Sequence, residues 1–261
     1  MSHTETLVCV ERDAYGVEGA VSVTMNRPSA FNALSESMLD ALDDELNRIA
    51  ESDARVVVIA GAGRAFCAGH DLKEMRATPS LAYYRALFAR CSRMMMTIQR
   101  MPQPVIARVH GIATAAGCQL VAMCDLAVAS DEARFAVSGV NLGLFCATPS
   151  VPLSRNVSRK AAFEMLVTGD FIDARTACER GLVNRVATAH ELDDTVCALA
   201  ASIARKPREA VAAGKRLFYQ QLETGMEAAY ALAAETMACN MMEASALEGT
   251  QAFIEKRPPR W

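Results

Sequence analysis

The stretch from Gly61 to Met75 contains residue types that can hold a negative charge with backbone donors. An apolar segment over residues 56–60 leads into it and is typical of a buried strand. Gly69 precedes the expected turn, and a glycine there lets the backbone approach a ligand closely because it has no Cβ. Asp71 is a suitable N-cap for a helix whose first N–H groups have no partner within that helix. The stretch predicts a corner that can stabilise an oxyanion, although an ordinary strand–turn–helix corner has the same pattern.

A second corner of this type follows later in the chain. Residues 104–111 have the pattern of a short apolar strand that stops at Gly111. Residues 112–120 are mostly small, and small residues at a helix start expose backbone N–H groups to a docked ligand. Two corners that each follow a strand therefore suggest two N–H donors for one oxygen.

Strand and helix patterns alternate up to about residue 190. Strands are expected at residues 7–12, 19–25, 56–60, 105–109 and 126–130. A helix is expected up to Ala50 with Ser35 as its N-cap, because apolar residues recur on one face. These residues are Met38, Leu39, Leu42, Leu46 and Ile49. The alternation is typical of an α/β fold.

The pattern becomes helical from Glu191 onward. Helices are expected at residues 192–204, 207–222 and 225–247, where alanine and methionine are frequent and charges are few. Such helices either cap the core or pack against other subunits.

Composition narrows the classes of function. The net charge is −3 and the isoelectric point is about 5.9, which argues against a nucleic-acid partner. No apolar run reaches the length of a membrane span. The nine cysteines include no CxxC pair and predict free thiols in a reducing compartment. The four histidines are scattered, so no metal site is expected. The first residues lack a signal or transit pattern, which predicts a cytoplasmic protein.

Several segments together resemble the crotonase superfamily, also called the enoyl-CoA hydratase/isomerase family. Residues 26–34, NRPSAFNAL, are similar to a family segment near the N-terminus, and residues 248–257, EGTQAFIEKR, are similar to one near the C-terminus. Between them, in the family's order, lie the two corners and then residues 165–170 and 177–183. Residues 116–120, AGCQL, and 143–146, GLFC, are similar to those of a sub-branch called enoyl-CoA hydratase domain-containing proteins. The resemblance implies an α/β fold with a ββα spiral core over residues 1–190 and a helical trimerisation region over residues 191–261.

The resemblance also implies chemistry on a coenzyme A thioester in fatty-acid or related acyl-CoA metabolism, by a lyase or isomerase. The family holds the thioester enolate with two backbone N–H groups, which fall on His70 and Ala116 of this chain. A homotrimer or a dimer of trimers is implied, with Lys256 approaching the nucleotide of a neighbouring subunit. The positions implied for binding coenzyme A are Arg27, Ala30, Ala68, Asp71, Leu72, Lys73, Phe253 and Lys256.

This chain departs from the hydratase pattern at both acidic positions. Active hydratases carry two glutamates there, whereas this sequence has Gln119 and Gly139. An amide does not exchange a proton near neutral pH, and glycine has no side chain. Hydration is therefore expected to be very weak, and restoring both carboxylates is expected to raise it, with Gly139 in a backbone conformation that favours glycine. The alternatives are a catalytically silent acyl-CoA-binding protein, or another reaction such as decarboxylation with the His70 side chain taking part. Asp125 is expected to make a buried structural hydrogen bond.

Overall fold

The structure is a computed structural model that describes residues 6–261. Its large sheet has six strands in the order β1-β2-β3-β5-β7-β10. All neighbouring pairs are parallel except β1 with β2. The strands are β1 (Val8–Arg12), β2 (Ala20–Met25), β3 (Val56–Gly61), β5 (Val105–Val109), β7 (Leu126–Ser130) and β10 (Arg185–Ala187). The five strands predicted from apolar runs are all present.

A second sheet has four short strands in the order β4-β6-β8-β9. These are β4 (Ala65–Cys67), β6 (Ile112–Thr114), β8 (Arg134–Ala136) and β9 (Ile172–Asp173). Along the chain β3 is followed by β4, β5 by β6 and β7 by β8, so each pass adds one strand to each sheet before a helix follows. This confirms the expected ββα spiral and the α/β class.

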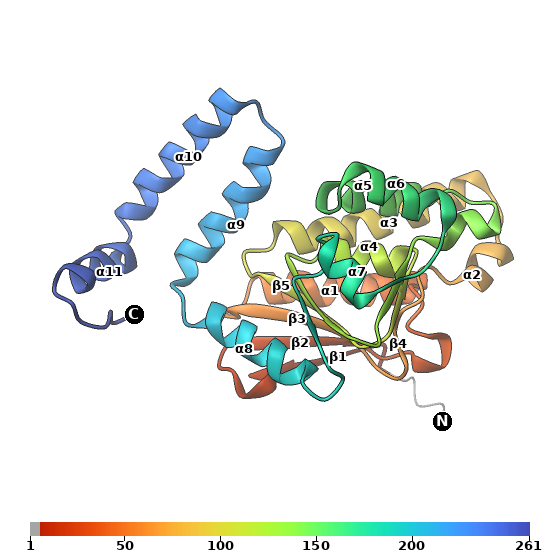
Figure 1. The fold of residues 1–261 in the computed structure, drawn as a ribbon, viewed down its shortest axis with the longest axis horizontal. Coiled ribbons are helices and arrows are strands. Elements are labelled where there is room, and N and C mark those ends of the chain that lie inside the picture. The colour runs from red at the N-terminus through yellow and green to blue at the C-terminus, as the bar shows by residue number, and fades with distance from the viewer. Residues whose placement is uncertain (1–5) are drawn as a thin grey trace.

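Helices cover both faces of the large sheet (Figure 1). One face packs against α1 (Glu36–Ala50), α3 (Leu81–Arg100) and α4 (Ala116–Met123), and the other packs against α8 (Leu192–Ala204). The helix predicted after Ser35 is confirmed, since the Ser35 hydroxyl accepts the Met38 N–H at 3.2 Å. Its five predicted core residues are all buried. The remaining short elements are η1 (Ala14–Gly16), η2 (Pro28–Ala30), α2 (Leu72–Ala77), η3 (Ser138–Leu142), α5 (Ala147–Asn156), α6 (Arg159–Thr168) and α7 (Ala174–Glu179).

The last three helices extend away from the core as an arm (Figure 1). They are α9 (Arg208–Leu222), α10 (Met226–Met241) and α11 (Ala244–Ile254). The single helix expected over residues 225–247 is wrong, because Glu243 adopts extended backbone (φ −67°, ψ 143°) and separates α10 from α11. The helix α8 packs on the large sheet, and the arm begins only at α9. The domain division at residue 190 remains a prediction.

A buried polar cluster joins α9 to the core. The Lys215 ammonium donates to Asp125 Oδ2 at 2.6 Å and to the backbone oxygens of Ile98 and Gln103. Asp125 Oδ2 also accepts the Val105 N–H at 2.7 Å, and its Oδ1 accepts the Tyr219 hydroxyl at 2.7 Å. The structural role predicted for Asp125 is confirmed.

Candidate active site

The two corners predicted from the sequence lie directly against each other. Gly69, just after β4, has φ +89°, a conformation that favours glycine. A Cβ placed on Gly69 would lie 3.0 Å from the Cβ of Ala115 and 3.1 Å from the backbone nitrogen of Ala116. The backbone before His70 therefore packs on the first residues of α4, as the two-donor arrangement requires.

The N–H groups of His70 and Ala116 have no hydrogen-bond acceptor within residues 6–261. For Ala116 the reason is its place as the first residue of α4, where an N–H has no partner in its own helix. Ala115 enters the helix at φ +50° and ψ −119°, and its own N–H is taken by the Ala136 oxygen. The junction thus leaves two backbone donors on adjoining segments available to an external oxygen.

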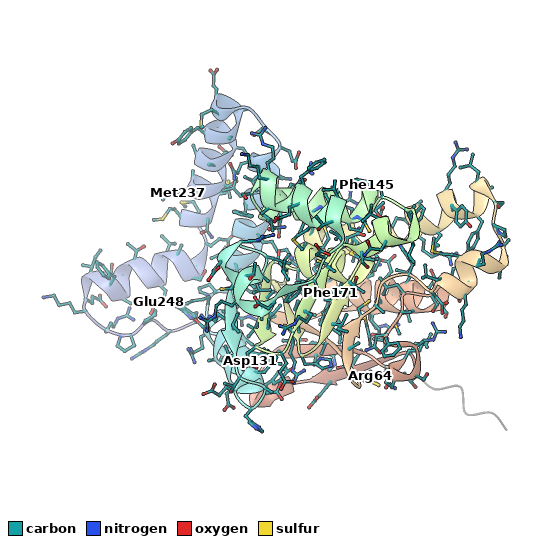
Figure 2. All side chains as sticks on the ribbon, turned by 45° about the vertical axis from the view of Figure 1, so that its right-hand side comes forward. Arg64, Asp131, Phe145, Phe171, Met237 and Glu248 are labelled. Atoms are coloured by element: carbon teal, nitrogen blue, oxygen red, sulfur yellow. The ribbon has the colours of Figure 1, made fainter. Side chains whose placement is uncertain are left out.

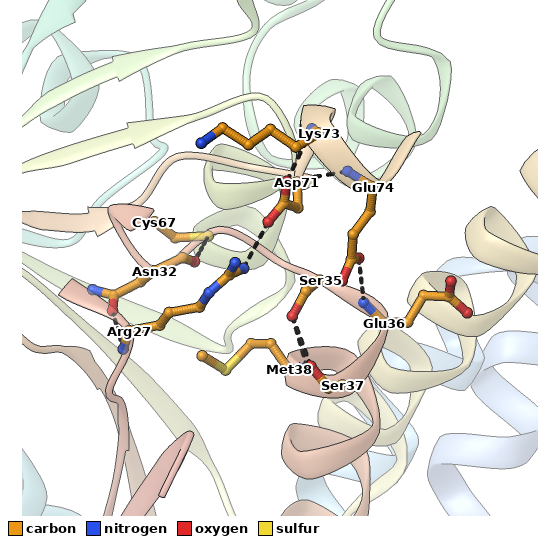
Figure 3. Close-up of polar contacts among 10 residues, drawn as sticks. All are labelled: Arg27, Asn32, Ser35, Glu36, Ser37, Met38, Cys67, Asp71, Lys73 and Glu74. Carbon is orange, nitrogen blue, oxygen red and sulfur yellow. Dashed lines mark hydrogen bonds and ion pairs between the residues drawn. The ribbon is translucent and has the colours of Figure 1, made fainter. Parts of the chain in front are cut away.

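Asp71 fixes the start of α2 and holds Arg27 (Figure 3). One carboxylate oxygen accepts the N–H groups of Lys73 at 2.9 Å and Glu74 at 3.3 Å, and the other accepts Arg27 Nη1 at 2.7 Å. Burial raises the pKa of Asp71, but Arg27 and the two N–H groups outweigh it, so the pKa lies below its usual value. The Arg27 guanidinium, expected to approach a nucleotide, is engaged with this carboxylate.

Asn32, for which no role is predicted from the sequence, holds the first corner. It is fully buried at φ +54°, a conformation that asparagine tolerates better than most residues. Its amide nitrogen donates to the backbone oxygens of Ala62, Ala65 and Phe66, and its side-chain oxygen accepts the Arg27 N–H. Asn32 therefore ties the NRPSAFNAL segment to β4, and only its place in that motif signals this from sequence.

His70 is half-buried, and its two ring nitrogens are enclosed. Its ring meets Phe88 of α3 edge to face, with centroids 5.6 Å apart. Neither ring nitrogen has a hydrogen-bond partner within the described residues. Burial lowers the pKa of His70, and the adjacent Leu34 backbone opposes this only in part, so the imidazole is neutral at pH 7.

The two positions without carboxylates differ in the space around them. Gln119 lies on α4 one turn after Ala116, is 4% exposed, and has a buried Oε1 with no partner in the described chain. A Cβ on Gly139 would lie 2.5 Å from the Leu144 oxygen and 2.7 Å from Cys146 Sγ. The expectation that Gly139 needs a glycine-specific backbone angle is wrong, because it lacks the positive φ of such glycines. Glycine is required there by crowding.

The other predicted binding residues form two separate groups. Ala30, Ala68, Leu72 and Lys73 lie near Arg27 and Asp71 at the start of α2, where the Ala68 N–H donates to the Phe31 oxygen at 3.0 Å. Phe253 lies on α11 and is 85% exposed, and Lys256 follows that helix. The arm places α11 far from α2 within one chain (Figure 1). One chain alone therefore does not bring all these residues together.

The thiols around the corners are neutral. Cys67 Sγ donates to the Asn32 oxygen at 3.2 Å, and Cys146 Sγ accepts the Gly139 N–H at 3.3 Å. Burial raises the pKa of Cys67 and of Cys118 to about 12 each, and it also raises the pKa of Cys146. From residue 6 to the end, no cluster of three or more histidine, cysteine or acidic side chains is arranged to hold a metal ion. No helix in that same range is long and apolar enough to cross a bilayer.

Comparisons with known proteins place this geometry in a family. A family model described as enoyl-CoA hydratase/isomerase matches residues 16–261. The human enoyl-CoA hydratase domain-containing protein 3, mitochondrial, is 44% identical over 246 residues, which are 94% of this chain and 81% of that protein. Its crystal structure superposes with a TM-score of 0.94 over 98% of this chain and all of that chain. An enoyl-CoA hydratase from Mycobacterium smegmatis is 64% identical, with a TM-score of 0.96 over 98% of this chain and 99% of the other.

One expectation is corrected by these relatives. The sequence predicted a cytoplasmic protein, but the rat, mouse and human relatives are named mitochondrial proteins, which contradicts it. The absence of a recognisable transit pattern was a poor guide to location. With a family match over nearly all of its length, the chain belongs to the enoyl-CoA hydratase/isomerase family, also called the crotonase superfamily, in the branch of the enoyl-CoA hydratase domain-containing proteins.

Proposed function

We propose that the protein binds an acyl-CoA thioester and stabilises its enolate with the N–H groups of His70 and Ala116. The observation that carries this proposal is the direct packing of the two corners, with both N–H groups lacking an acceptor. Negative charge that develops on the thioester oxygen then meets two fixed donors. One such donor contributes roughly 2.7–4 kcal/mol to the stability of a transition state.

Two measurements on the unmodified protein test this proposal. Calorimetry should show butyryl-CoA binding more tightly than free coenzyme A, because only the thioester offers a carbonyl oxygen to the two donors. Infrared spectroscopy with a ¹³C-labelled thioester carbonyl should show a lower stretching frequency in the complex, since hydrogen bonds weaken the C=O bond. No binding of any acyl-CoA, or a bound carbonyl at its solution frequency, would contradict the proposal.

Replacing Gly69 with alanine is expected to weaken acyl-CoA binding at least tenfold, about 1.4 kcal/mol. The new Cβ would press on Ala115 and on the Thr114 oxygen, each 3.0 Å away, and would push the two donors apart. Gly16→Ala is the matched control, because Gly16 also has positive φ but has no other atom within 4 Å of its Cβ position. Calorimetry with butyryl-CoA should show the loss for Gly69→Ala alone. Equal affinities would show that the spacing of the corners does not matter.

Hydration of crotonyl-CoA is expected to be very weak, and Gln119→Glu should raise it by up to roughly 10²-fold. The new carboxyl group has nearly the same shape as the amide that it replaces, whose Oε1 has no partner to lose among residues 6–261. Gly139→Glu should give no gain and should destabilise the protein, because its Cβ meets the Leu144 oxygen and Cys146 Sγ. The double variant should therefore not exceed Gln119→Glu. A wild-type hydration rate typical of hydratases would overturn this prediction.

A second candidate function is a catalytically silent acyl-CoA-binding protein. The observation that favours it is the lack of a carboxylate at positions 119 and 139. Incubating the protein with enoyl-, malonyl- and hydroxyacyl-CoA thioesters, followed by mass spectrometry, separates the two functions. Binding without a product from any thioester would support the silent protein.

The arm is proposed to pack against sister subunits in a homotrimer or a dimer of trimers. Met237 lies on it away from the core (Figure 2). Large apolar side chains on α10 and α11 are mostly exposed, which is unusual for a monomer. They include Met226, Tyr230, Met237, Phe253 and Ile254. A groove of about 720 Å³ beside α5 and α6, lined by Phe145, Phe163 and Val167, is a further apolar surface. Sedimentation should show trimers or hexamers, and a stable monomer at micromolar concentration would contradict this.

A further inference from the structure

We propose that the arm of one copy lies in the groove beside α5 and α6 of the next copy, so that the subunits join head to tail. This inference rests on the proposed assembly and goes beyond it in naming the two surfaces that meet. It does not depend on thioester binding. A head-to-tail contact joins two different surfaces, whereas a two-fold contact pairs one surface with itself.

The groove is an apolar surface that reaches down to the core. Phe163 and Val167, one turn apart on α6, and Phe145, just before α5, are exposed along it. Ala162 and Leu166 also line it and are buried. With a volume of about 720 Å³, the groove suits the apolar face of a helix, which is a common way for one protein segment to bind another.

The arm carries an apolar helix face that its own chain leaves uncovered. Met226, Tyr230, Met237 and Met241 are spaced by four, seven and four residues, which places them on one face of α10. All four are exposed, so α9, against which α10 packs, does not cover this stripe. The stripe therefore has the length and the apolar character that the groove suits.

Basic residues stand at the groove. Residues 133–163 contain no aspartate or glutamate, and Arg159 and Lys160 line the groove. Neither of these two cations forms an ion pair with any residue from 6 to 261. Glu164, which also lines the groove, is paired with Arg180 at 2.8 Å. The groove therefore attracts a partner that is both apolar and negatively charged.

The arm has the opposite charge. Residues 217–255 contain six glutamates and no lysine or arginine. Glu227 and Glu235 on α10 form no ion pair within the described part of the chain. Two arms that faced each other would bring like charges together, and so would two grooves, whereas an arm in a groove joins opposite charges. The charge pattern thus favours contact between unlike surfaces.

A second copy is needed to bring the two surfaces together. Within one chain the stripe on α10 and the apolar residues of the groove are both exposed, so neither covers the other. Figure 2 shows Phe145 on the core and Met237 on the arm. Each copy offers one groove and one arm, so contacts of this kind continue from copy to copy until a ring closes. A ring of three is the proposed trimer.

The test is a pair of variants that each lose one surface. Phe163→Glu places a negative charge in the groove, and Met237→Glu places one on the stripe. The two side chains are 62% and 70% exposed, so neither change enters the core. Each variant alone should sediment as a monomer, because every contact needs an intact groove and an intact arm. An equal mixture should form a dimer with one copy of each, since the arm of Phe163→Glu can enter the groove of Met237→Glu.

Leu81→Glu is the matched control, because Leu81, the first residue of α3, is 64% exposed and lies outside both surfaces. It should assemble as the wild type does. Charge is tested separately in the intact chain. Replacing Arg159 and Lys160 with glutamate should raise the dissociation constant of the assembly at least roughly tenfold, and replacing Glu227 and Glu235 with lysine in the same chain should recover most of that loss.

Each other outcome contradicts a defined part of this account. Assembly of Phe163→Glu alone would show that arms meet arms, and assembly of Met237→Glu alone would show that grooves meet grooves. Either result, a mixture that stays monomeric, or a charge reversal without rescue would overturn the inference while leaving the proposed trimer in place. A wild-type protein that sediments as a stable monomer would overturn both. Calorimetry with butyryl-CoA measures thioester binding independently of all these results.

Discussion

Gly117→Ala is expected to destabilise the protein by about 3 kcal/mol or more, although a change from glycine to alanine normally stabilises a helix. Gly117 is the second residue of α4, and a Cβ there would lie 2.1 Å from the Cys67 oxygen and 2.7 Å from its carbonyl carbon. Both are backbone atoms of β4, so no flexible side chain can move aside. The measurement is urea unfolding at a fixed protomer concentration.

The same substitution at Gly214 is the control for this prediction. Gly214 lies inside α9, and its Cβ position has no other described atom within 4 Å. Gly214→Ala should therefore stabilise the protein by roughly 0.5–1 kcal/mol through helix propensity alone. Opposite signs for the two variants would support close packing of α4 on β4. Two stabilising variants would refute it.

Asp125→Ala is expected to destabilise the protein by about 3–5 kcal/mol. The change leaves the Lys215 ammonium, whose side chain is 6% exposed, without its only carboxylate among the described residues. It also removes the acceptor of the Tyr219 hydroxyl and of the Val105 N–H. Urea unfolding measures the loss, and limited proteolysis should show faster cleavage around α9, because this cluster holds that helix to the core.

An exposed ion pair provides the comparison for Asp125. Arg155 and Glu223 are more than half exposed and 3.4 Å apart, so Glu223→Ala should cost less than about 1 kcal/mol. Replacing both members of the buried pair, Asp125→Leu with Lys215→Met, should be much less harmful than Asp125→Ala alone, because no unpaired charge remains. A double variant as unstable as the single one would show that the charge is not the cause.

The parts of the fold that could be predicted are those with local signals. Five of the six strands of the large sheet were predictable, because each is a segment of five or six residues rich in apolar side chains, and α1 was predictable from its capping serine and one apolar face. The sixth, β10, has three residues and was not predicted. The strands β4, β6 and β8 have three residues each, too few to show a period, and they exist through pairing with one another. The break between α10 and α11 has no glycine or proline to mark it.

The candidate site divides in the same way. Gly69 and the capping Asp71 were predictable because a turn and a helix start have local residue preferences. The buried contact of Gly117 with Cys67, the three hydrogen bonds from Asn32, and the crowding of Gly139 by Cys146 depend on residues far apart in the chain or on loop packing. The pairing of Arg27 with Asp71 likewise became visible only once the chain was folded.

The two donors at the corners are main-chain atoms, which determines how they can be studied. Alanine scanning leaves every backbone N–H in place. A scan across residues 68–117 would therefore keep the N–H donor of residue 70, and it would not change Ala116 at all because that residue is already alanine. Replacing the amide that precedes each residue with an ester, by semisynthesis, removes one N–H while keeping the side chain. An ester series would therefore test each donor directly, whereas a side-chain scan can change the donors only indirectly, as Gly69→Ala does by moving them apart.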